Sequence, residues 1–215
     1  MSGRGPYLAL AKETYAKQMR NPSVSAGAIR YLTEHGIGEY AIAERYGLGY
    51  VAEPLPGDER FTGMLAIPYL HGDSVVAIKY RNLGSGPKYA QHHGQKSRLY
   101  NADAFFRAEH VVGIAEGEAD AIAASERVGI PSFGVPGVDT WGKMSTVWRP
   151  IFKDFQHVMI FADGDEAGRG FATEVAEDLG WRARIVQCPD GEDVGSMCAA
   201  GRAEELIAKC QLASQ

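Results

Sequence analysis

The sequence predicts an α/β protein, in which a mostly parallel four-stranded sheet with flanking helices follows an N-terminal α+β subdomain. From His110 onward, short apolar segments typical of buried strands alternate with segments of helical periodicity, and this alternation predicts a parallel sheet with helices on both faces. Before it, helical segments come first, and two apolar segments on either side of the sequence HGD then predict a β-hairpin. We therefore expect two parts, residues 1–108 and residues 109–215.

In the N-terminal part, local sequence signals place each expected element. Helical spacing of apolar residues is present at residues 6–20, 23–37 and 38–50. The second of these segments reaches Gly36, a residue type that commonly ends helices. The apolar residues at 64–70 and 74–83 form the two arms of the hairpin. Residues 84–101 predict an ordered loop, because they are neither low in complexity nor simply rich in glycine and serine.

In the C-terminal part, the expected strands and helices follow one another in regular order. Strands are expected at four apolar segments, residues 110–116, 132–135, 157–163 and 182–188. Helices are expected from Ala119, across residues 144–155, from Glu166 and across residues 202–212. Because parallel strands need crossover connections, a helix between successive strands is the arrangement that such a sheet requires.

Composition limits the class of protein. The chain has 215 residues, a formal net charge of −5 and no apolar segment suited to a membrane span or a secretory signal, so we expect a cytoplasmic protein without a membrane partner. Its three cysteines, Cys188, Cys198 and Cys210, lack C-x-x-C spacing, which argues against a disulfide framework and against a cysteine-based zinc site. We therefore expect no zinc.

Acidic residues directly follow the strand expected at residues 157–163. Asp163 and Asp165 stand at its carboxyl end, the edge of a parallel sheet where ligands bind, and two carboxylates this close in sequence can share a divalent cation. The alternative is that an aspartate here caps the helix that begins near Glu166. The sequence leaves both interpretations open.

The strand expected at residues 110–116 also ends in acidic residues. Glu116, Glu118 and Asp120 fall at the same sheet edge as the first pair of aspartates, and like charges gathered there raise one another's pKa unless a cation binds. Mg²⁺ suits such a cluster because it takes hard oxygen ligands. For Glu118 and Asp120, acids in the first turn of a helix are the alternative interpretation.

A basic and aromatic tract precedes the alternating part. No acidic residue lies between Asp73 and Asp103. Cations there alternate with aromatic or imidazole side chains: Lys79, Tyr80, Arg81, Lys88, Tyr89, His92, His93, Lys96, Arg98 and Tyr100. Such a tract can follow a phosphate backbone and stack on bases even in an acidic protein. The alternative is a solvated basic surface loop.

Several of these segments resemble a known family. A strand ending in Glu-Gly (EGEAD, 116–120) and a later strand ending in Asp-x-Asp (DGDEAG, 163–168) resemble the Toprim domain, which topoisomerases, DnaG-type primases, recombination mediators and some nucleases share. Further segments, among them GMLAIPYLHGDSVVAIKYRNL, GPKYAQ, QKSRLYN and CPDGEDV, resemble consecutive parts of the bacterial DnaG-type primase polymerase core. The resemblance covers nearly the whole chain from residue 28 and implies a Rossmann-like Toprim fold after the N-terminal subdomain.

The resemblance assigns roles to the acidic residues. It implies that Glu116, Asp163 and Asp165 are catalytic, metal-binding acids, and that Asp120 and Asp193 are further metal ligands. The cofactor that it implies is Mg²⁺ or Mn²⁺.

The sequence departs from the family pattern after Asp193. It reads EDVGS, so Gly195 stands where the family has a second aspartate, and we expect one metal to bind more weakly or to take its ligand from Asp190 or Glu192. A Gly-Arg pair after DGDEA matches the family and makes Arg169 a candidate for contacting nucleotide phosphate. An arginine on an exposed helix face is the alternative.

The resemblance also places Arg81, Lys88 and Lys96 on the template-binding surface. The function that it implies is synthesis of short RNA primers on single-stranded DNA, by metal-dependent nucleotidyl transfer from ribonucleoside triphosphates during DNA replication. A Toprim nuclease and a non-catalytic DNA-binding replication or recombination protein are the alternatives. Recombination mediators of this kind carry a zinc finger of four cysteines, which three cysteines cannot supply.

The zinc-binding and helicase-binding domains usual in this family are not recognised in the sequence. We therefore expect a separate zinc-domain protein or a replicative helicase as a partner. A chain of this size fits a bacteriophage replication protein that acts in the cytoplasm of a bacterial host. The sequence leaves open whether the chain is complete or a fragment.

Overall fold

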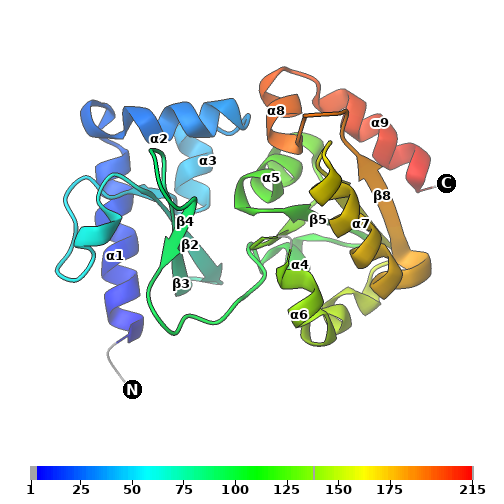
Figure 1. Ribbon diagram of the computed structural model, residues 1–215, viewed down its shortest axis with the longest axis horizontal. Coiled ribbons are helices and arrows are strands. Elements are labelled where there is room, and N and C mark those ends of the chain that lie inside the picture. Colours follow the sequence, from blue (N-terminus) through cyan, green and yellow to red (C-terminus); the bar gives the residue numbers. More distant parts are fainter. Residues whose placement is uncertain (1–3, 138, 215) are drawn as a thin grey trace. The chain divides into compact units, whose positions relative to one another are not determined.

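The computed structural model describes residues 4–137 and 139–214, which fall into two compact units (Figure 1). The first unit extends to Thr33 and resumes over Gly38–Lys96, and the second contains Glu34–Ile37 and the residues from Ser97 onward. The functional division expected between residues 108 and 109 remains a prediction. Each unit is described below by itself.

The first unit combines helices with an antiparallel sheet. Its helices are α1 (Arg4–Met19), α2 (Pro22–Glu34) and α3 (Tyr40–Arg45). Its strands, in their order across the sheet, are β1 (Gly49–Tyr50), β2 (Leu65–His71), β3 (Ser74–Arg81) and β4 (Tyr89–Gln91). The expected hairpin is β2 with β3, in which His71 pairs with Ser74. Part of the expected loop is instead strand β4, which pairs antiparallel with the end of β3.

Helix α1 packs on this sheet along one apolar stripe. Leu8, Ala11 and Tyr15, three or four positions apart, are buried, and side chains with this spacing share one face of a helix. They pack in one cluster with Ile78 and Tyr80 of β3. This packing holds β3 in place, and β3 carries part of the basic tract.

The second unit is built on a parallel sheet. Its strands, in sheet order, are β6 (Ser132–Val135), β5 (Val111–Glu116), β7 (His157–Ala162) and β8 (Ala183–Gln187). Its helices are α4 (Ala104–Arg107), α5 (Glu118–Ala123), α6 (Thr140–Trp148), α7 (Glu166–Leu179), α8 (Val194–Ala199) and α9 (Ala203–Ala213). The fold class predicted from the sequence is thereby confirmed, whereas the short helices α4 and α8 were not expected.

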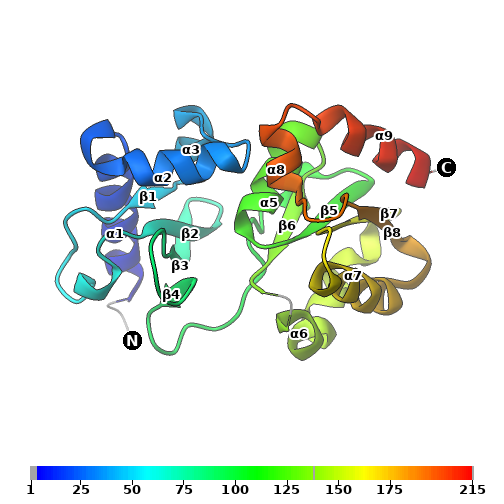
Figure 2. The same ribbon diagram turned by 45° about the horizontal axis from the view of Figure 1, so that its top comes forward.

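Helices cover both faces of the parallel sheet. Figures 1 and 2 show α5, α8 and α9 on one side of it and α6 and α7 on the other. Ile114 of β5 and Ile160 of β7 are completely buried in one core with Trp141 of α6 and Val175 of α7. Burial on both faces explains why these strands are continuously apolar rather than alternating.

Two features of the fold bear on function. The central strands β5 and β7 are neighbours in the sheet and run parallel, so their carboxyl ends lie side by side at one edge. Among the helices that the structure describes, none combines the length and the apolar character needed to cross a bilayer.

Candidate functional site

The carboxyl ends of β5 and β7 bring acidic residues together. Ala115 of β5 pairs with Phe161 of β7, so Glu116 and Asp163 follow paired positions on neighbouring strands. Asp163 also lies within electrostatic range of Asp120, Asp193 and Asp165, since all four of the other acids raise its pKa. The structure thus brings together the five acids that the sequence analysis selected.

Burial and mutual repulsion shift the pKa values of two of these carboxyls. Burial, followed by the charges of the neighbouring acids, raises the pKa of Asp163 to about 8. Burial and the charges of Asp193 and Glu116 raise the pKa of Asp120 to about 7, against the opposing effect of a hydrogen bond from the Gly195 N–H. Concentrated negative charge at this edge is therefore unfavourable near neutral pH without a compensating cation.

Two of the acids also cap helices. Asp165 is the N-cap of α7 and accepts a hydrogen bond of 2.7 Å from the Gly168 N–H through Oδ1. Asp193 is the N-cap of α8 and forms a capping box with Ser196. The helix-cap interpretation of the DGDEAG segment is therefore confirmed for Asp165. The cap uses one of the two carboxylate oxygens, so it does not exclude the predicted role in cation binding.

The loop that carries Asp163 and Asp165 is fixed by Gly164. A Cβ atom on this glycine would collide with the carbonyl oxygen of Pro189, so no other residue fits here without a shift of the backbone. The Gly164 N–H donates to the Glu192 carbonyl oxygen at 2.7 Å, and the Gly191 N–H donates to the Gly164 carbonyl oxygen at 2.8 Å. These bonds hold the two acidic loops against each other.

The donor set at this edge fits a divalent cation. Oδ1 of Asp163 is buried and has no hydrogen-bond partner in the part of the chain that the structure describes, which is costly for a carboxylate unless a cation binds it. Oxygen donors of this kind are those that Mg²⁺ and Mn²⁺ prefer. Within residues 4–137 and 139–214, no three acidic, histidine or cysteine side chains surround one ion position.

The crowded acids lead to a prediction about stability without metal. The raised pKa of Asp163 means that the folded protein holds this proton more tightly than the unfolded chain, so stability is lost as pH rises from about 4 toward about 8. We expect Asp163→Asn, which keeps the group neutral, to raise the Tm at pH 8 in EDTA by roughly 2–8 °C, corresponding to about 1–2 kcal/mol.

Thermal melts of the two proteins between pH 4.5 and 8.5 test this expectation. The difference in Tm should shrink toward the acidic end, where the wild-type carboxyl is also protonated. Asp154→Asn, at an exposed aspartate of the same unit, is the matched control and should leave the Tm unchanged. A constant difference at every pH would contradict the assignment of the shift to charge crowding.

Asp190 and Glu192, the two acids predicted to replace the aspartate that is missing at position 195, each contact an arginine. Glu192 accepts hydrogen bonds of 2.7 Å and 2.8 Å from Arg202. The side chain of Asp190 is 99% exposed and lies 3.5 Å from Arg169. Arg169 itself is half exposed in the first turn of α7, close in sequence to the acidic loop. A role of Asp190 or Glu192 as a replacement metal ligand remains a prediction.

The basic tract contains a cluster of cations and tyrosines. The Arg81 guanidinium lies 5.0 Å from the ring centre of Tyr31 and 5.0 Å from that of Tyr89. Lys79 and Lys88 approach the Tyr89 ring to 3.8 Å and 5.9 Å. Nε and Nη1 of Arg81 are buried without a hydrogen-bond partner among the described residues, so an anion reaches them only if neighbouring side chains move aside.

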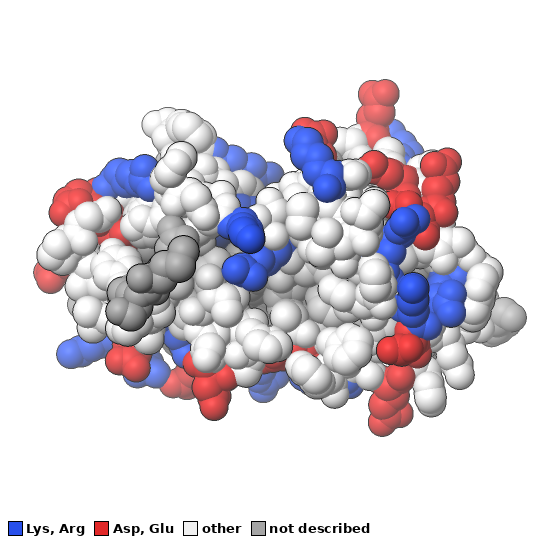
Figure 3. Space-filling model, turned by 90° about the horizontal axis from the view of Figure 1, so that it is seen from below, with Lys and Arg blue, Asp and Glu red and all other residues white. Residues whose placement is uncertain are grey.

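Tyr31 was missed in the sequence analysis because it lies far from the tract, in α2. A half-buried tyrosine on a helix has no local signal that pairs it with an arginine on a distant strand. Lys88 and Lys96 are both exposed, as expected of residues that contact a phosphate backbone. Figure 3 shows acidic and basic side chains interspersed on one face of the molecule.

Two members of the tract, Tyr80 and Tyr100, are buried. Tyr80 donates to Oδ2 of Asp58, a completely buried carboxylate, at 3.2 Å. The interpretation of these two tyrosines as base-stacking side chains is therefore wrong. His92 is partly exposed and places Nε2 2.8 Å from Oδ1 of Asp58, so its role in stacking stays a prediction. A buried carboxylate needs such partners, and sequence spacing alone does not reveal them.

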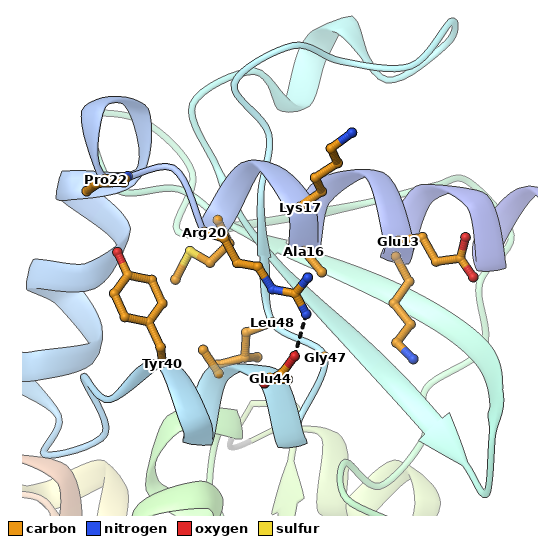
Figure 4. A pocket seen from close by; sticks show the side chains of 12 residues that line it. Glu13, Ala16, Lys17, Arg20, Pro22, Tyr40, Glu44, Gly47 and Leu48 are labelled. Atoms are coloured by element: carbon orange, nitrogen blue, oxygen red, sulfur yellow. Dashed lines mark hydrogen bonds and ion pairs between the residues drawn. The ribbon is translucent and has the colours of Figure 1, made fainter.

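A hollow of about 790 Å³ lies between α1 and α3 of the first unit. Ala16, Met19 and Leu48 are among its apolar lining residues, and Arg20 reaches across it to an ion pair with Glu44 (Figure 4). Exposed ion pairs of this kind contribute little to stability, so this ion pair does little to hold α1 and α3 together across the hollow.

The fold and the acid cluster together define a protein that contains a Toprim domain. The Toprim-like family model matches residues 113–197, which extend from β5 into α8. The RNA polymerase domain of Mycobacterium tuberculosis primase DnaG, in complex with double-stranded DNA, superposes with a TM-score of 0.74 at 21% identity, covering 97% of this chain and 81% of that chain. The DnaG primase catalytic domain bound to ssDNA superposes with a TM-score of 0.70 at 19% identity, covering 96% and 81%. The chain therefore has the fold of the DnaG catalytic core.

A closer sequence relative comes from a bacteriophage. The Gene 57 protein of Mycobacterium phage D29 is 44% identical over 153 residues, which are 68% of this chain and 97% of that protein. This chain belongs to the family of that phage protein.

Proposed function

We propose that this protein is the catalytic core of a DNA primase, which synthesises short RNA primers on a single-stranded DNA template. The observation that carries the proposal is the gathering of Glu116, Asp163 and Asp165, with two further acids, at one sheet edge of a chain with the DnaG core fold. The raised pKa values of the buried carboxyls mean that these groups ionise readily at neutral pH only when a cation offsets their repulsion. A reaction on phosphates that depends on a bound metal ion would supply that cation.

Glu116, Asp163 and Asp165 would hold the cation, and Asp120 and Asp193 would complete or orient its shell. Bound Mg²⁺ or Mn²⁺ would supply Lewis acidity for attack of a 3′ hydroxyl on the α-phosphate of a ribonucleoside triphosphate, with pyrophosphate as the leaving group. The protein itself positions the groups: the caps of α7 and α8 fix Asp165 and Asp193, and the Gly195 N–H fixes Asp120. No side-chain nucleophile is required.

Other residues of the chain would bind the anionic substrates. Arg81, beside Tyr31 and Tyr89, would contact a template phosphate, and the exposed Lys88 and Lys96 would contact neighbouring phosphates. Arg169, in the first turn of α7, would exchange its contact with Asp190 for a phosphate of the incoming nucleotide. Phosphate contacts position a strand but carry little sequence information.

Incubation with single-stranded DNA, labelled ribonucleotides and Mg²⁺ or Mn²⁺ tests the proposal. A ladder of short RNA, lost on addition of EDTA, is the expected result. Shortened DNA in place of RNA would identify a Toprim nuclease instead. DNA binding without either product, over a range of metals and templates, would identify a non-catalytic DNA-binding protein.

A further inference from the structure

Gly195 takes part in the acid site through its backbone. It is the second residue of α8 and follows Asp193, the N-cap of that helix, by two positions. Its N–H donates a hydrogen bond of 2.9 Å to Oδ1 of Asp120, and the bond is buried. The first turn of α8 therefore sets the orientation of Asp120 and also carries Asp193.

His35 fills the space in front of Gly195. A Cβ atom on Gly195 would lie 3.0 Å from Cβ, 3.1 Å from Cα and 3.1 Å from Cδ2 of His35, all closer than ordinary van der Waals contact. Backbone and imidazole atoms of His35 therefore occupy the space where a side chain at position 195 would begin. A side chain at position 195 fits only if His35 gives way.

The segment around His35 is held against α8, so it cannot move aside freely. Glu34–Ile37 belongs to the same compact unit as the acid site. Nε of Arg127 donates to the Gly36 carbonyl oxygen at 2.7 Å, and Ile37 is completely buried. Gly36, with φ +69°, lies so close to Cys198 of α8 that an added Cβ would stand 2.7 Å from the Cβ of that cysteine.

We propose that His35 is a positioning residue of the acid site. By packing on Gly195 it fixes the first turn of α8, and this turn presents Asp120 and Asp193 to a divalent cation with its bound nucleotide triphosphate. The proposal rests on the proposed function for the identity of that ligand. It also explains the absence of a second carboxylate at this turn, because the imidazole of His35 occupies the place into which a side chain at 195 would project.

The variant His35→Ala tests the proposal, with titration calorimetry of Mn²⁺ into metal-free protein as the direct measurement. Residues that orient metal ligands typically change metal affinity by roughly 10- to 100-fold, and we expect about tenfold weaker Mn²⁺ binding here because His35 acts through Gly195. In nucleotide transfer, the Mg²⁺ concentration for half-maximal rate should rise, while kcat at saturating Mg²⁺ stays close to that of the wild type. His35→Asn, which keeps a planar polar group where His35→Ala removes it, should restore most of the affinity.

Gly195→Ala disturbs the same contact by adding a Cβ at position 195. It provides an independent test if His35→Ala fails to fold. We expect it to weaken Mn²⁺ binding to a similar extent, and the double variant should lose less than the sum of both, because the two residues share one contact. His71→Ala, at an exposed histidine of the other unit, is the matched control and should bind Mn²⁺ like the wild type.

The outcomes separate this proposal from the proposed function. Wild-type Mn²⁺ affinity in both His35→Ala and Gly195→Ala would overturn the positioning role, whatever activity the protein has. Weaker Mn²⁺ binding in both variants of a protein that makes no RNA would support the positioning role and overturn the primase assignment. A fall in the Tm of the metal-free variants without a change in Mn²⁺ affinity would show that His35 only stabilises the fold.

Discussion

Asp163→Asn and Asp165→Asn should each reduce nucleotide transfer by at least roughly 10³-fold, because a missing ligand forfeits several kcal/mol of charge stabilisation in the transition state. Both substitutions should remove a carboxylate charge without disturbing the fold. Asparagine is as good an N-cap as aspartate, so Asp165→Asn should keep the cap of α7. Asp163→Asn removes a charge that four neighbouring acids oppose. RNA synthesis on a single-stranded template at millimolar Mg²⁺ is the measurement.

Binding of single-stranded DNA provides the control for these two variants. The affinity should stay within about twofold of the wild type, since the proposed template contacts lie in the basic tract and not among the acids. Asp154→Asn should retain full activity, because this aspartate is exposed and precedes the amino end of β7, whereas Asp163 follows the carboxyl end of that strand. Near-normal synthesis by either acid variant would show that these carboxylates do not hold the catalytic metal.

Arg81→Ala should weaken binding of single-stranded DNA by roughly 10- to 100-fold, because hydrogen bonds to a charged group contribute about 1.5–3 kcal/mol. The two tyrosine rings hold the guanidinium in place, so little side-chain entropy is lost when a phosphate binds. Lys88→Ala and Lys96→Ala should have smaller effects, because both lysines are exposed and flexible. Fluorescence anisotropy at several salt concentrations measures both effects.

The salt dependence distinguishes a phosphate contact from a general loss of structure. Each of the three substitutions should lower the slope of log affinity against log salt by about one unit. Arg81→Lys keeps the charge but loses the planar stack, so we expect its affinity to fall between those of the wild type and Arg81→Ala. An unchanged slope in all three alanine variants would identify the tract as a solvated surface that does not contact DNA.

Much of the fold follows from local sequence patterns. The alternation of apolar strands and helical segments after His110 predicted the parallel sheet, and the hairpin around HGD predicted β2 and β3. Both signals are strong because burial on two faces or on one face sets the spacing of apolar residues. Strand β4 was missed since three residues are too few for a periodic pattern, and pairing with β3 alone makes them a strand.

The candidate site was predictable to the extent that its residues end strands. Glu116 and Asp163 each follow a strand of a parallel sheet, and the topology of such sheets places those ends at one edge. Arg81 was selected because the family resemblance places it on the template-binding surface. Its partner Tyr31, and the contact of His92 with Asp58, could not be predicted, because each depends on a contact between segments far apart in the chain.

The sequence by itself therefore determined the class of fold, the family resemblance and the acids at the strand ends, since these depend on residue type and short-range spacing. Only the tertiary structure decided how those acids are held. Asp165 and Asp193 cap helices, the Gly195 N–H orients Asp120, and His35 fills the space before that glycine. The physical reason is that close packing and hydrogen bonding act between neighbours in space, and the sequence does not state which distant segments become neighbours.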